Sequence, residues 1–559
     1  MTTLASTNTK LKSPLEMLYG WEKSQPDKIF QTQPFADEVK TWTWAQFADE
    51  VRRMAAAIEA KGYEPGSKIG ILSKNCAHWM MSDLAIMMSG HISVPIYPNV
   101  NAETVEYVLN HSEAKMLFVG KLDNHDWKVM KNGIPDGLEC VSYGIYELPD
   151  ADEYTTWNDL TQSHEPMEGE PDRDLDEMMT IIYTSGTTGK PKGVVLKFVS
   201  PVFAIETFID LFYIKSTDRF FSYLPMSHIA ERMLITMGTL RSGGSVNFAH
   251  SLETFPKDLA ACQPTIFLGV PRIWAKFQSG VLAKFSQSKL NTLFAIPIVG
   301  GLIKGLIKKK LGLKEARVCL TGAAPIPVST LEWYNKMGVR ILEVYGMTEN
   351  SAYSHSNLPG AYKFGTVGQT LRDCETKITE EGEICVKSLA NMTEYYKEPE
   401  KTAETLRDGW LHTGDKGEFD SEGYLRITGR VKDIFKTSKA KYVAPNPIEM
   451  LFSKNELVEQ VCVVGTGIPQ PLALVVLSED GRKKNPDEVK ASLEATLKEV
   501  NPKLEHHEKL QKAVVVKEEW TTENGMLTPT LKIKRGSIDD RYQSFYEKWY
   551  EGGKGVVFE

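Results

Sequence analysis

Hydrophobic and polar residues follow two alternating periods along the first part of the chain. Residues 45–62 place Phe47, Val51, Met54 and Ile58 on one helical face, and residues 78–90 and 101–112 also have a helical pattern. Short apolar runs at residues 67–75, 91–98 and 114–120 separate these segments and predict strands. Strands and helices that alternate in this way predict a mainly parallel sheet with helices on its faces, which is an α/β fold.

The pattern changes at two places farther along. Residues 147–176 are rich in acidic residues, proline and threonine, so we expect a surface connection before the strand predicted at residues 178–184. Residues 424–445 are dense in Lys and Arg and indicate a joint between domains. Beyond them, strands at 458–465, 472–479 and 513–519 and a helix at 487–500 predict a small α+β unit of ordinary domain size.

Composition narrows the class of protein. The 559 residues carry 65 Lys+Arg and 73 Asp+Glu, a net charge of −8, and 42% are hydrophobic. These values exclude wholesale disorder and give no support to nucleic-acid binding. The seven cysteines are scattered without a C-x-x-C pair, which argues against a disulfide framework and a zinc site. No apolar run reaches the ~18 residues that span a bilayer. We expect a cytoplasmic protein with at most peripheral contact at the inner face of a membrane; the sequence leaves the oligomeric state open.

One segment has the composition of a phosphate-binding loop. Residues 183–195, YTSGTTGKPKGVV, follow a predicted strand and combine three glycines with hydroxyl and amine side chains. Glycines allow backbone N–H groups to turn inward, and Lys190 and Lys192 add positive charge. The spacing differs from that of a P-loop, because two residues separate Gly186 from Gly189 and a proline follows Lys190. We predict a polyphosphate site, with a flexible surface loop as the alternative.

Further motifs follow this loop in a recognisable order. They are FSYLPMSHIAER, LTGAAPI, ILEVYGMTEN, DGWLHTGD, YLRITGRVKD, FKTSKAKYVAP and LTPTLKIKR. Together they resemble the adenylate-forming enzymes, which include acyl-CoA synthetases, luciferases and peptide-synthetase adenylation domains. The forms LPMSHIAER and TPTLKIKR are most similar to long-chain fatty acyl-CoA synthetases. The resemblance covers nearly the whole chain and implies an N-terminal adenylation domain (residues 1–430), a hinge (431–433, with Lys432 at its centre) and a small mobile C-terminal domain (434–559).

The resemblance also implies a nucleotide site. Glu349 is expected to hold Mg²⁺ together with Thr184, since Mg²⁺ prefers carboxylate and phosphate oxygens. Asp415 and Arg430 are expected to contact the ribose, and the Tyr345 ring can stack on a flat base. The implied ATP- and AMP-binding residues are Thr184, Ser185, Gly186, Thr187, Thr188, Gly189, Lys190, Gly322, Ala323, Ala324, Tyr345, Gly346, Thr348, Asp415, Arg430 and Lys436. Taken alone, Gly322 and Ala323 equally indicate close packing, Asp415 a turn, and Arg430 a surface ion pair.

Two residues are implied in catalysis. Lys532 matches the family's lysine that contacts the acyl carboxylate and the α-phosphate, where an ammonium offsets charge developing at phosphorus. Taken alone, it is one of several basic residues in a tail. His228 matches a residue beside the acyl carboxylate, although a lone histidine is more often structural. Met226, Val270 and Trp274 are candidate lining for an acyl tunnel, with ordinary core packing as the alternative.

A passage for coenzyme A is implied along Ser438, Lys439, Ala440 and Lys441. Relatives that make CoA thioesters usually have a glycine where this chain has Ala440. A glycine there either adopts positive φ or leaves room for close approach. If positive φ is the reason, alanine costs on the order of 1 kcal/mol, which is tolerable. We expect the tolerable case.

The resemblance thus predicts a two-step ligase that uses ATP, a long-chain fatty acid and coenzyme A, with Mg²⁺ as cofactor. An enzyme that passes the acyl group to a carrier protein or another acceptor is the nearest alternative, and a nucleotide-binding module without turnover is a more distant one.

Residues 293–314 combine apolar residues with Lys304, Lys308, Lys309, Lys310 and Lys314. This combination predicts contact with anionic headgroups, or a core helix with a solvated end.

Overall fold

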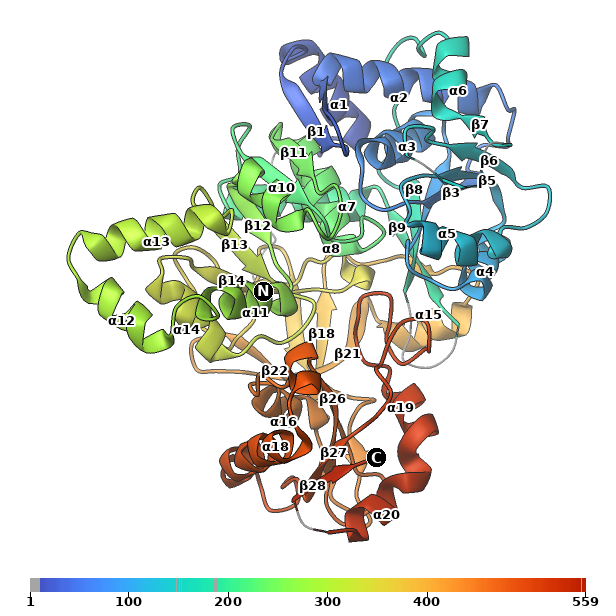
Figure 1. The fold of residues 1–559 in the computed structure, drawn as a ribbon. Helices are drawn as coiled ribbons and strands as arrows, with labels where there is room; N and C mark the ends of the chain where they lie inside the picture. Colours follow the sequence, from blue (N-terminus) through green and yellow to red (C-terminus); the bar gives the residue numbers. More distant parts are fainter. Residues whose placement is uncertain (1–10, 147, 150, 152, 185–189, 554) are drawn as a thin grey trace.

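A computed structural model describes residues 11–146, 148–149, 151, 153–184, 190–553 and 555–559. Within them, two large sheets share one hydrophobic core in the N-terminal part, and a smaller C-terminal unit lies below them in Figure 1. Core residues from both large sheets, such as Ile71 and Phe220, belong to the same cluster. Helix α3 (Ala77–Met88), which is buried along its whole length, contacts strands of both sheets. The predicted α/β class is confirmed.

The eight-stranded sheet forms from the βα units of the first part of the chain. Its strands are parallel from β8 to β7, while β9 pairs antiparallel with both β8 and β19. Helices α2 (Trp44–Glu59) and α4 (Ala102–Ser112) fall where the periodicity places them. In sheet order the strands are β19 (Glu394–Tyr395), β9 (Lys192–Lys197), β8 (Met178–Thr184), β4 (Ile92–Ile96), β3 (Lys68–Leu72), β5 (Ala114–Val119), β6 (Glu139–Ser142) and β7 (Thr155–Thr156).

The nine-stranded sheet carries several of the motifs at its strand ends. In sheet order its strands are β16 (Gln369–Thr370), β15 (His355–Ser356), β14 (Ile341–Tyr345), β13 (Val318–Thr321), β12 (Ile266–Leu268), β10 (Arg219–Ser222), β11 (Ser245–Phe248), β1 (Ile29–Pro34) and β2 (Val39–Thr43). The strands from β14 to β1 run parallel. Their carboxyl ends therefore meet at one edge, which is where parallel sheets bind ligands.

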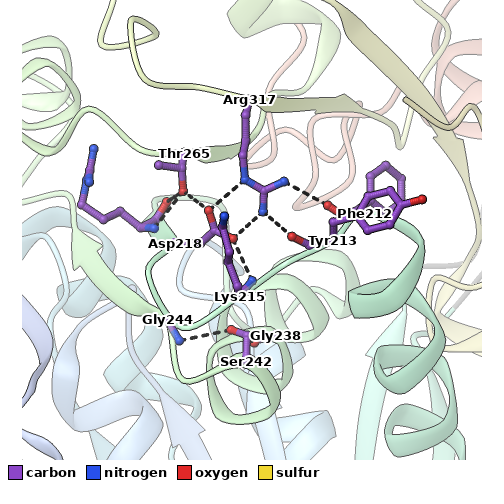
Figure 2. Close-up of polar contacts among 10 residues, drawn as sticks. Phe212, Tyr213, Lys215, Asp218, Gly238, Ser242, Gly244, Thr265 and Arg317 are labelled. Atoms are coloured by element: carbon purple, nitrogen blue, oxygen red, sulfur yellow. Dashed lines mark hydrogen bonds and ion pairs between the residues drawn. The ribbon is translucent and has the colours of Figure 1, made fainter. Parts of the chain in front are cut away.

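A partly buried ion pair fixes the opposite edge of this sheet. Figure 2 shows Asp218 accepting from the Thr265 hydroxyl (2.7 Å) and from Arg317 Nε (3.0 Å), at the amino ends of β10, β12 and β13. Burial by itself raises the pKa of Asp218, but the hydrogen bonds from Arg317, the Lys215 N–H and Thr265 outweigh burial and hold that pKa below its ordinary value. The ion pair therefore anchors three strands whose other ends carry the candidate site.

A five-stranded antiparallel sheet follows in the chain and brings the two predicted ribose contacts together. It contains β17 (Glu375–Ile378), β18 (Glu383–Lys387), β20 (Leu406–Arg407), β21 (Trp410–Phe419) and β22 (Leu425–Arg430). In the register of β21 and β22, Asp415 lies opposite Arg430. Pairing in the sheet thus sets two charged side chains side by side.

The C-terminal unit is built on its own core. Strands β25 (Val458–Val464), β26 (Leu472–Leu477), β27 (Lys512–Val515) and β28 (Gly555–Phe558) form its sheet. Helices α16 (Pro445–Phe452) and α18 (Pro486–Val500) cover one face, and α19 (Arg535–Tyr542) and α20 (Tyr546–Glu551) cover the other. A two-stranded hairpin, β23 (Phe435–Lys436) and β24 (Tyr442–Val443), precedes it. The hinge and domain boundaries stay predictions.

One prediction about the fold was wrong. Residues 147–176 are more than a surface connection, because β7 and helix α6 (Trp157–Ser163) lie within them. Trp157 is fully buried and donates to Glu50 at 2.7 Å, and Thr156 and Asp159 form a capping box at the start of α6. Among the described residues, no helix is long and apolar enough to cross a membrane.

Candidate active site

Asp415, Arg430 and Tyr345 form a hydrogen-bonded group at the carboxyl end of β14. The Tyr345 hydroxyl donates to Asp415 Oδ2 at 2.7 Å, and Arg430 Nε donates to Oδ1 at 2.7 Å. The charge of Asp415 raises the pKa of the Arg430 guanidinium, and burial raises the pKa of Tyr345. The motifs that carry these residues are far apart in the chain, so folding alone brings them together. Together with Glu349 and Lys532 we call them the central cluster.

Glu349 lies beside this group on a short 3-10 turn (Thr348–Asn350) and is 8% exposed. Its Oε1 accepts from the Tyr395 hydroxyl at 2.8 Å, and Lys192 lies 4.6 Å from the centroid of the Tyr395 ring. Lys192 is the register partner of Thr184, across β8 and β9. Burial and the charges of Lys432 and Lys401 lower the pKa of Lys192, and the charge of Glu349 opposes this lowering. Glu349 and Thr184 are thus linked through Tyr395 and Lys192.

These two residues fit a hard divalent cation. Thr184 offers a hydroxyl, and Glu349 keeps its second carboxylate oxygen free of the Tyr395 hydrogen bond. Carboxylate and hydroxyl oxygens are the ligands that Mg²⁺ takes in proteins, usually together with phosphate oxygens and water. The donor set therefore suits the predicted Mg²⁺.

Lys532 comes to the central cluster from the C-terminal unit. Its pKa is lowered because surrounding protein atoms desolvate the ammonium and because Arg430 adds positive charge; Asp415 and Glu349 act in the opposite direction. The Lys532 residue is solvent-exposed. The loop before it is closed by the Thr528 N–H, which donates to the Lys532 carbonyl at 2.7 Å, and Asn99 of the N-terminal part donates to Pro529 O at 3.0 Å.

His228 also faces the charge of Lys532. Burial lowers the pKa of the ring to about 4, and Lys532 adds to the shift. His228 is the N-cap of helix α8 (Ile229–Arg232), where its Nδ1 accepts from the Ala230 N–H at 3.2 Å. The imidazole is therefore neutral at pH 7 and carries its proton on Nε2. A neutral donor of this kind can orient a carboxylate without acting as a base.

The LTGAAP segment divides into packing and exposed positions. A Cβ on Gly322 would lie 2.9 Å from Val344 Cγ2, so this glycine is required for close packing against β14. Ala323 and Ala324 are exposed beyond the end of β13, and Ala323 has φ +67°. A Cβ on Gly346 would lie 2.4 Å from the Ala352 backbone.

Of the predicted loop residues, Ser185, Gly186, Thr187, Thr188 and Gly189 lie outside the described residues, and Lys190 lies 5.1 Å from the Tyr107 ring centroid.

The candidate acyl-binding residues have packing partners of their own. Trp274 is fully buried, donates to Gly269 O at 2.8 Å and packs edge-on against Tyr334. Met226 is also fully buried, and its N–H donates to Asn75 Oδ1 at 3.0 Å. Val270 is half-buried at the start of helix α11 (Pro271–Leu282). An acyl-binding role for these residues stays a prediction.

The predicted coenzyme A passage forms the turn of the β23–β24 hairpin. Ser438, Lys439, Ala440 and Lys441 are exposed there, and Ala440 has φ +59°. Of the two reasons considered for a glycine at this position, positive φ is therefore the one that this backbone has. Lys432 is exposed and contributes positive charge near Lys192. Lys436 is exposed, with its ammonium 5.6 Å from the Tyr442 ring centroid, as in many surface lysines.

Sequence reasoning missed three supporting residues. Tyr395 binds Glu349 from 46 positions away, and no spacing signal links them. Glu383 accepts from the Gly414 N–H (2.9 Å) and contacts His412 Nδ1 (2.8 Å), so it orients the turn before Asp415. Arg232, in the predicted LPMSHIAER motif, forms a buried ion pair with Asp83 at 2.6 Å that fixes α8 to α3. The adjacent charges of Glu231 and Arg232 in that motif could have indicated such a role.

Comparison with known proteins agrees with this architecture. Residues 19–396 match the family described as AMP-binding enzyme, and residues 432–554 match the AMP-binding enzyme C-terminal domain. A rat protein named long-chain-fatty-acid–CoA ligase 5 is 30% identical over 91% of this chain and 84% of its own length. Long chain acyl-CoA synthetase 2 of Arabidopsis thaliana is 29% identical over 98% and 93%.

Solved structures show the same fold at lower identity. The adenylation domain of a carboxylate reductase from Mycobacterium chelonae superposes with a TM-score of 0.81 at 22% identity, over 98% of this chain and 92% of its own. The anthranilate CoA ligase AuaEII superposes with a TM-score of 0.77 at 21% identity, over 95% and 97%. The family match covers more than half of the chain and includes the motifs of the central cluster as far as Glu349. The chain therefore belongs to the AMP-binding, adenylate-forming enzyme family and is a ligase of that family.

Proposed function

We propose that this ligase activates a long-chain fatty acid with ATP and transfers the acyl group to coenzyme A. The fatty acid and the acceptor follow from the names of the relatives, several of which are long-chain-fatty-acid–CoA ligases. The observation that carries the catalytic part is that the loop bearing Lys532 is hydrogen-bonded to Asn99 of the N-terminal part, where the charges of Arg430, Asp415 and Glu349 act on the Lys532 ammonium.

In the proposed first step, the fatty acid carboxylate attacks the α-phosphate of ATP and pyrophosphate leaves. The carboxylate is an adequate nucleophile, so the protein needs to position the reactants and neutralise charge. Lys532 donates to the oxygens at the reacting phosphorus, and the neutral His228 orients the carboxylate. Asp415 keeps lone pairs for the ribose hydroxyls while Arg430 and Tyr345 hold its orientation.

Mg²⁺ bound by Glu349 and Thr184 would neutralise phosphate charge and favour the departure of pyrophosphate. Tyr395 keeps the Glu349 carboxylate in one orientation, and Lys192 and Lys432 add positive charge for the leaving phosphates. In the proposed second step, the thiolate of coenzyme A attacks the acyl carbonyl and AMP leaves. Resemblance to the family implies that the C-terminal domain rotates between the steps and presents the hairpin of Ser438–Lys441.

Pyrophosphate release tests the substrate class. The enzyme is given ATP, Mg²⁺ and a series of saturated fatty acids of graded length, with benzoate and acetate as controls. We expect kcat/KM to rise with chain length and to be highest for a long-chain acid. A maximum at acetate or benzoate would overturn the fatty acid assignment and leave the adenylate chemistry intact.

AMP release with and without coenzyme A tests the acceptor. We expect coenzyme A to accelerate AMP release and acyl-CoA to accumulate in equal amount. The alternative acceptor is a carrier protein; one solved structure with this fold is the A-PCP didomain of a carboxylic acid reductase from Segniliparus rugosus. If coenzyme A leaves turnover unchanged and a pantetheinylated carrier protein accelerates it, the alternative is correct.

A further inference from the structure

A pair of helices at one edge of the molecule exposes apolar side chains. Helices α12 (Gln287–Ala295) and α13 (Val299–Lys310) pack on each other and project at the left of Figure 1, away from the C-terminal unit. Ile298, Leu302 and Leu306 are 84%, 70% and 56% exposed. Their spacing of four residues places them on one side of α13, and exposed Ile296 and Val299 extend this surface. We call these five residues the docking face.

The exposure does not result from a loosely attached helix. Gly300 and Ile307 on the other side of α13 are buried, and a Cβ on Gly300 would lie 2.6 Å from Phe294 O. Ile307 belongs to the same core as Leu290 of α12. A surface helix normally has one apolar side toward the core and a polar side toward water. Helix α13 has apolar residues on the side that packs against the core and also on the side that faces solvent. The solvent-facing side is therefore available for a partner.

The charge around the docking face differs from that of the rest of the chain. Residues 259–314 contain no Asp or Glu, in a protein whose net charge is −8. Their basic residues are Arg272, Lys276, Lys284, Lys289, Lys304, Lys308, Lys309, Lys310 and Lys314. Lys309 and Lys310 are exposed in the last turn of α13, directly beyond Leu306. Lysines there stabilise a helix C-terminus, but helix stability does not account for the absence of acidic residues over the whole segment.

We propose that the docking face binds the surface of an anionic lipid bilayer. Aliphatic side chains of an interfacial helix bury themselves at the boundary between headgroups and acyl chains. Lysines at the border of the face reach the lipid phosphates, and their long stems contribute apolar area. The exposed aliphatic residues of α13 suit the acyl-chain boundary, and the lysines beside them carry the charge that anionic headgroups attract.

A second copy of this chain fits the docking face less well. In a two-fold symmetric contact the same surface meets itself, which would bring the lysines of two protomers together without an acidic residue between them. A nucleic acid would pair with the lysines but would leave Ile298, Leu302 and Leu306 against a polar backbone. An anionic lipid surface both attracts the lysines and buries the exposed apolar side chains.

Co-sedimentation with vesicles tests the proposal, with the full chain and without ATP, fatty acid or coenzyme A. We compare phosphatidylcholine vesicles with vesicles that contain about one third phosphatidylglycerol, because the expected attraction depends on anionic lipid. We expect binding to the anionic vesicles at low salt and a strong decrease at about 0.5 M salt, where charges are screened. Failure to bind anionic vesicles at low salt would overturn the proposal, as would equal binding to both compositions at every salt concentration.

Variants with matched controls locate the contact. Leu302→Gln with Leu306→Gln should lower the partition coefficient about tenfold or more, since both leucines leave water on binding. Lys309→Gln with Lys310→Gln should lower it by roughly tenfold to thirtyfold on anionic vesicles. The controls are Val39→Gln, at a position 62% exposed on β2, and Lys490→Gln with Lys498→Gln on α18, where both lysines are exposed. They should leave the partition coefficient unchanged, and an equal loss in the controls would contradict the assigned surface.

Analytical ultracentrifugation without lipid addresses the second-copy alternative. We expect the wild type and the Leu302→Gln, Leu306→Gln variant to sediment alike. If the wild type self-associates and this variant does not, the docking face is covered by another copy and the proposal is wrong. Because every arm is measured without substrates, either result leaves the proposed ligase activity to its own test.

Discussion

Lys532 stands among other charges of the central cluster, which makes its replacement informative. Its ammonium is desolvated and close to Arg430, yet Asp415 and Glu349 favour its charged form. Replacing Lys532 with alanine should slow adenylate formation by roughly a hundred- to a thousandfold, the usual effect of removing a group that stabilises developing charge. Rapid-quench measurement of pyrophosphate release gives this rate.

The second half-reaction supplies the control for this variant. Thioester formation from chemically supplied acyl-adenylate should be much less affected, because the family's lysine acts in the first step. Similar losses in both half-reactions would contradict the catalytic assignment of Lys532. The same variant should raise the pKa of His228, because the positive charge that lowers it is removed.

Tyr395 supports Glu349 from outside the predicted motifs. The Tyr395→Phe variant removes the hydroxyl that donates to Glu349 Oε1 at 2.8 Å and keeps the ring under Lys192. Loss of a group that orients a metal ligand typically weakens metal binding 10- to 100-fold. We therefore expect the Mg²⁺ concentration for half-maximal activity to rise about tenfold. Tyr396→Phe is the matched control, and an unchanged Mg²⁺ requirement in Tyr395→Phe would remove this residue from the site.

At the scale of elements, the β23–β24 hairpin holds a non-glycine residue in a left-handed conformation. Ala440 has φ +59°, and its N–H donates to Thr437 O at 2.9 Å within the turn. The Ala440→Gly variant should raise the free energy of unfolding of the C-terminal unit by up to about 1 kcal/mol, because glycine adopts this conformation without strain. Urea denaturation followed by circular dichroism measures the change.

The matched control has the opposite expected sign. Ala495 is exposed inside helix α18, where alanine to glycine should cost about 1 kcal/mol. If the strain at Ala440 were the whole effect, coenzyme A-dependent turnover would change only modestly in Ala440→Gly. A large gain in acyl-CoA formation would instead indicate that the methyl group narrows the passage.

At the scale of the whole molecule, few described polar contacts cross between the large part and the C-terminal unit. Arg272 of α11 forms an ion pair with Glu459 of β25, and Asn99 donates to Pro529 O. The Arg272 side chain is 62% exposed, so the pair contributes at most about 1 kcal/mol. Arg272→Ala should therefore reduce the rate of adenylate formation by up to about fivefold, by weakening the orientation that keeps Lys532 near Asp415 and Glu349, and should spare thioester formation.

A pair within the C-terminal unit provides the comparison. Arg482 and Glu519 are similarly exposed but lie on the same side of the hinge. Arg482→Ala should change neither half-reaction. The effect of Arg272→Ala should also disappear at high salt, where the wild-type ion pair is screened. A salt-independent loss would mean that Arg272 acts by packing.

Local pattern was sufficient to determine most of the secondary structure and the identity of the motifs. Helices α2, α3 and α4 and the strands between them follow directly from the spacing of apolar residues, because that spacing decides which face each element can bury. The segment around α6 was misjudged because its helix has only seven residues and buries only Trp157, Leu160 and Thr161 within an otherwise polar stretch. Periodicity does not identify so short a helix, which is held by a few side chains and a capping box.

Tertiary structure decided the contacts that join distant segments. The sequence named Asp415 and Glu349, but the pairing of Tyr345 with Asp415 and of Tyr395 with Glu349 depends on strands that meet only in the folded chain. The sequence likewise left open whether residues 293–314 are a core helix or an exposed one, because α13 is apolar on both sides. Only the fold shows which side is buried. The chain thus determines its elements and its chemical groups locally, while burial and charge environment depend on neighbours brought from far along the sequence.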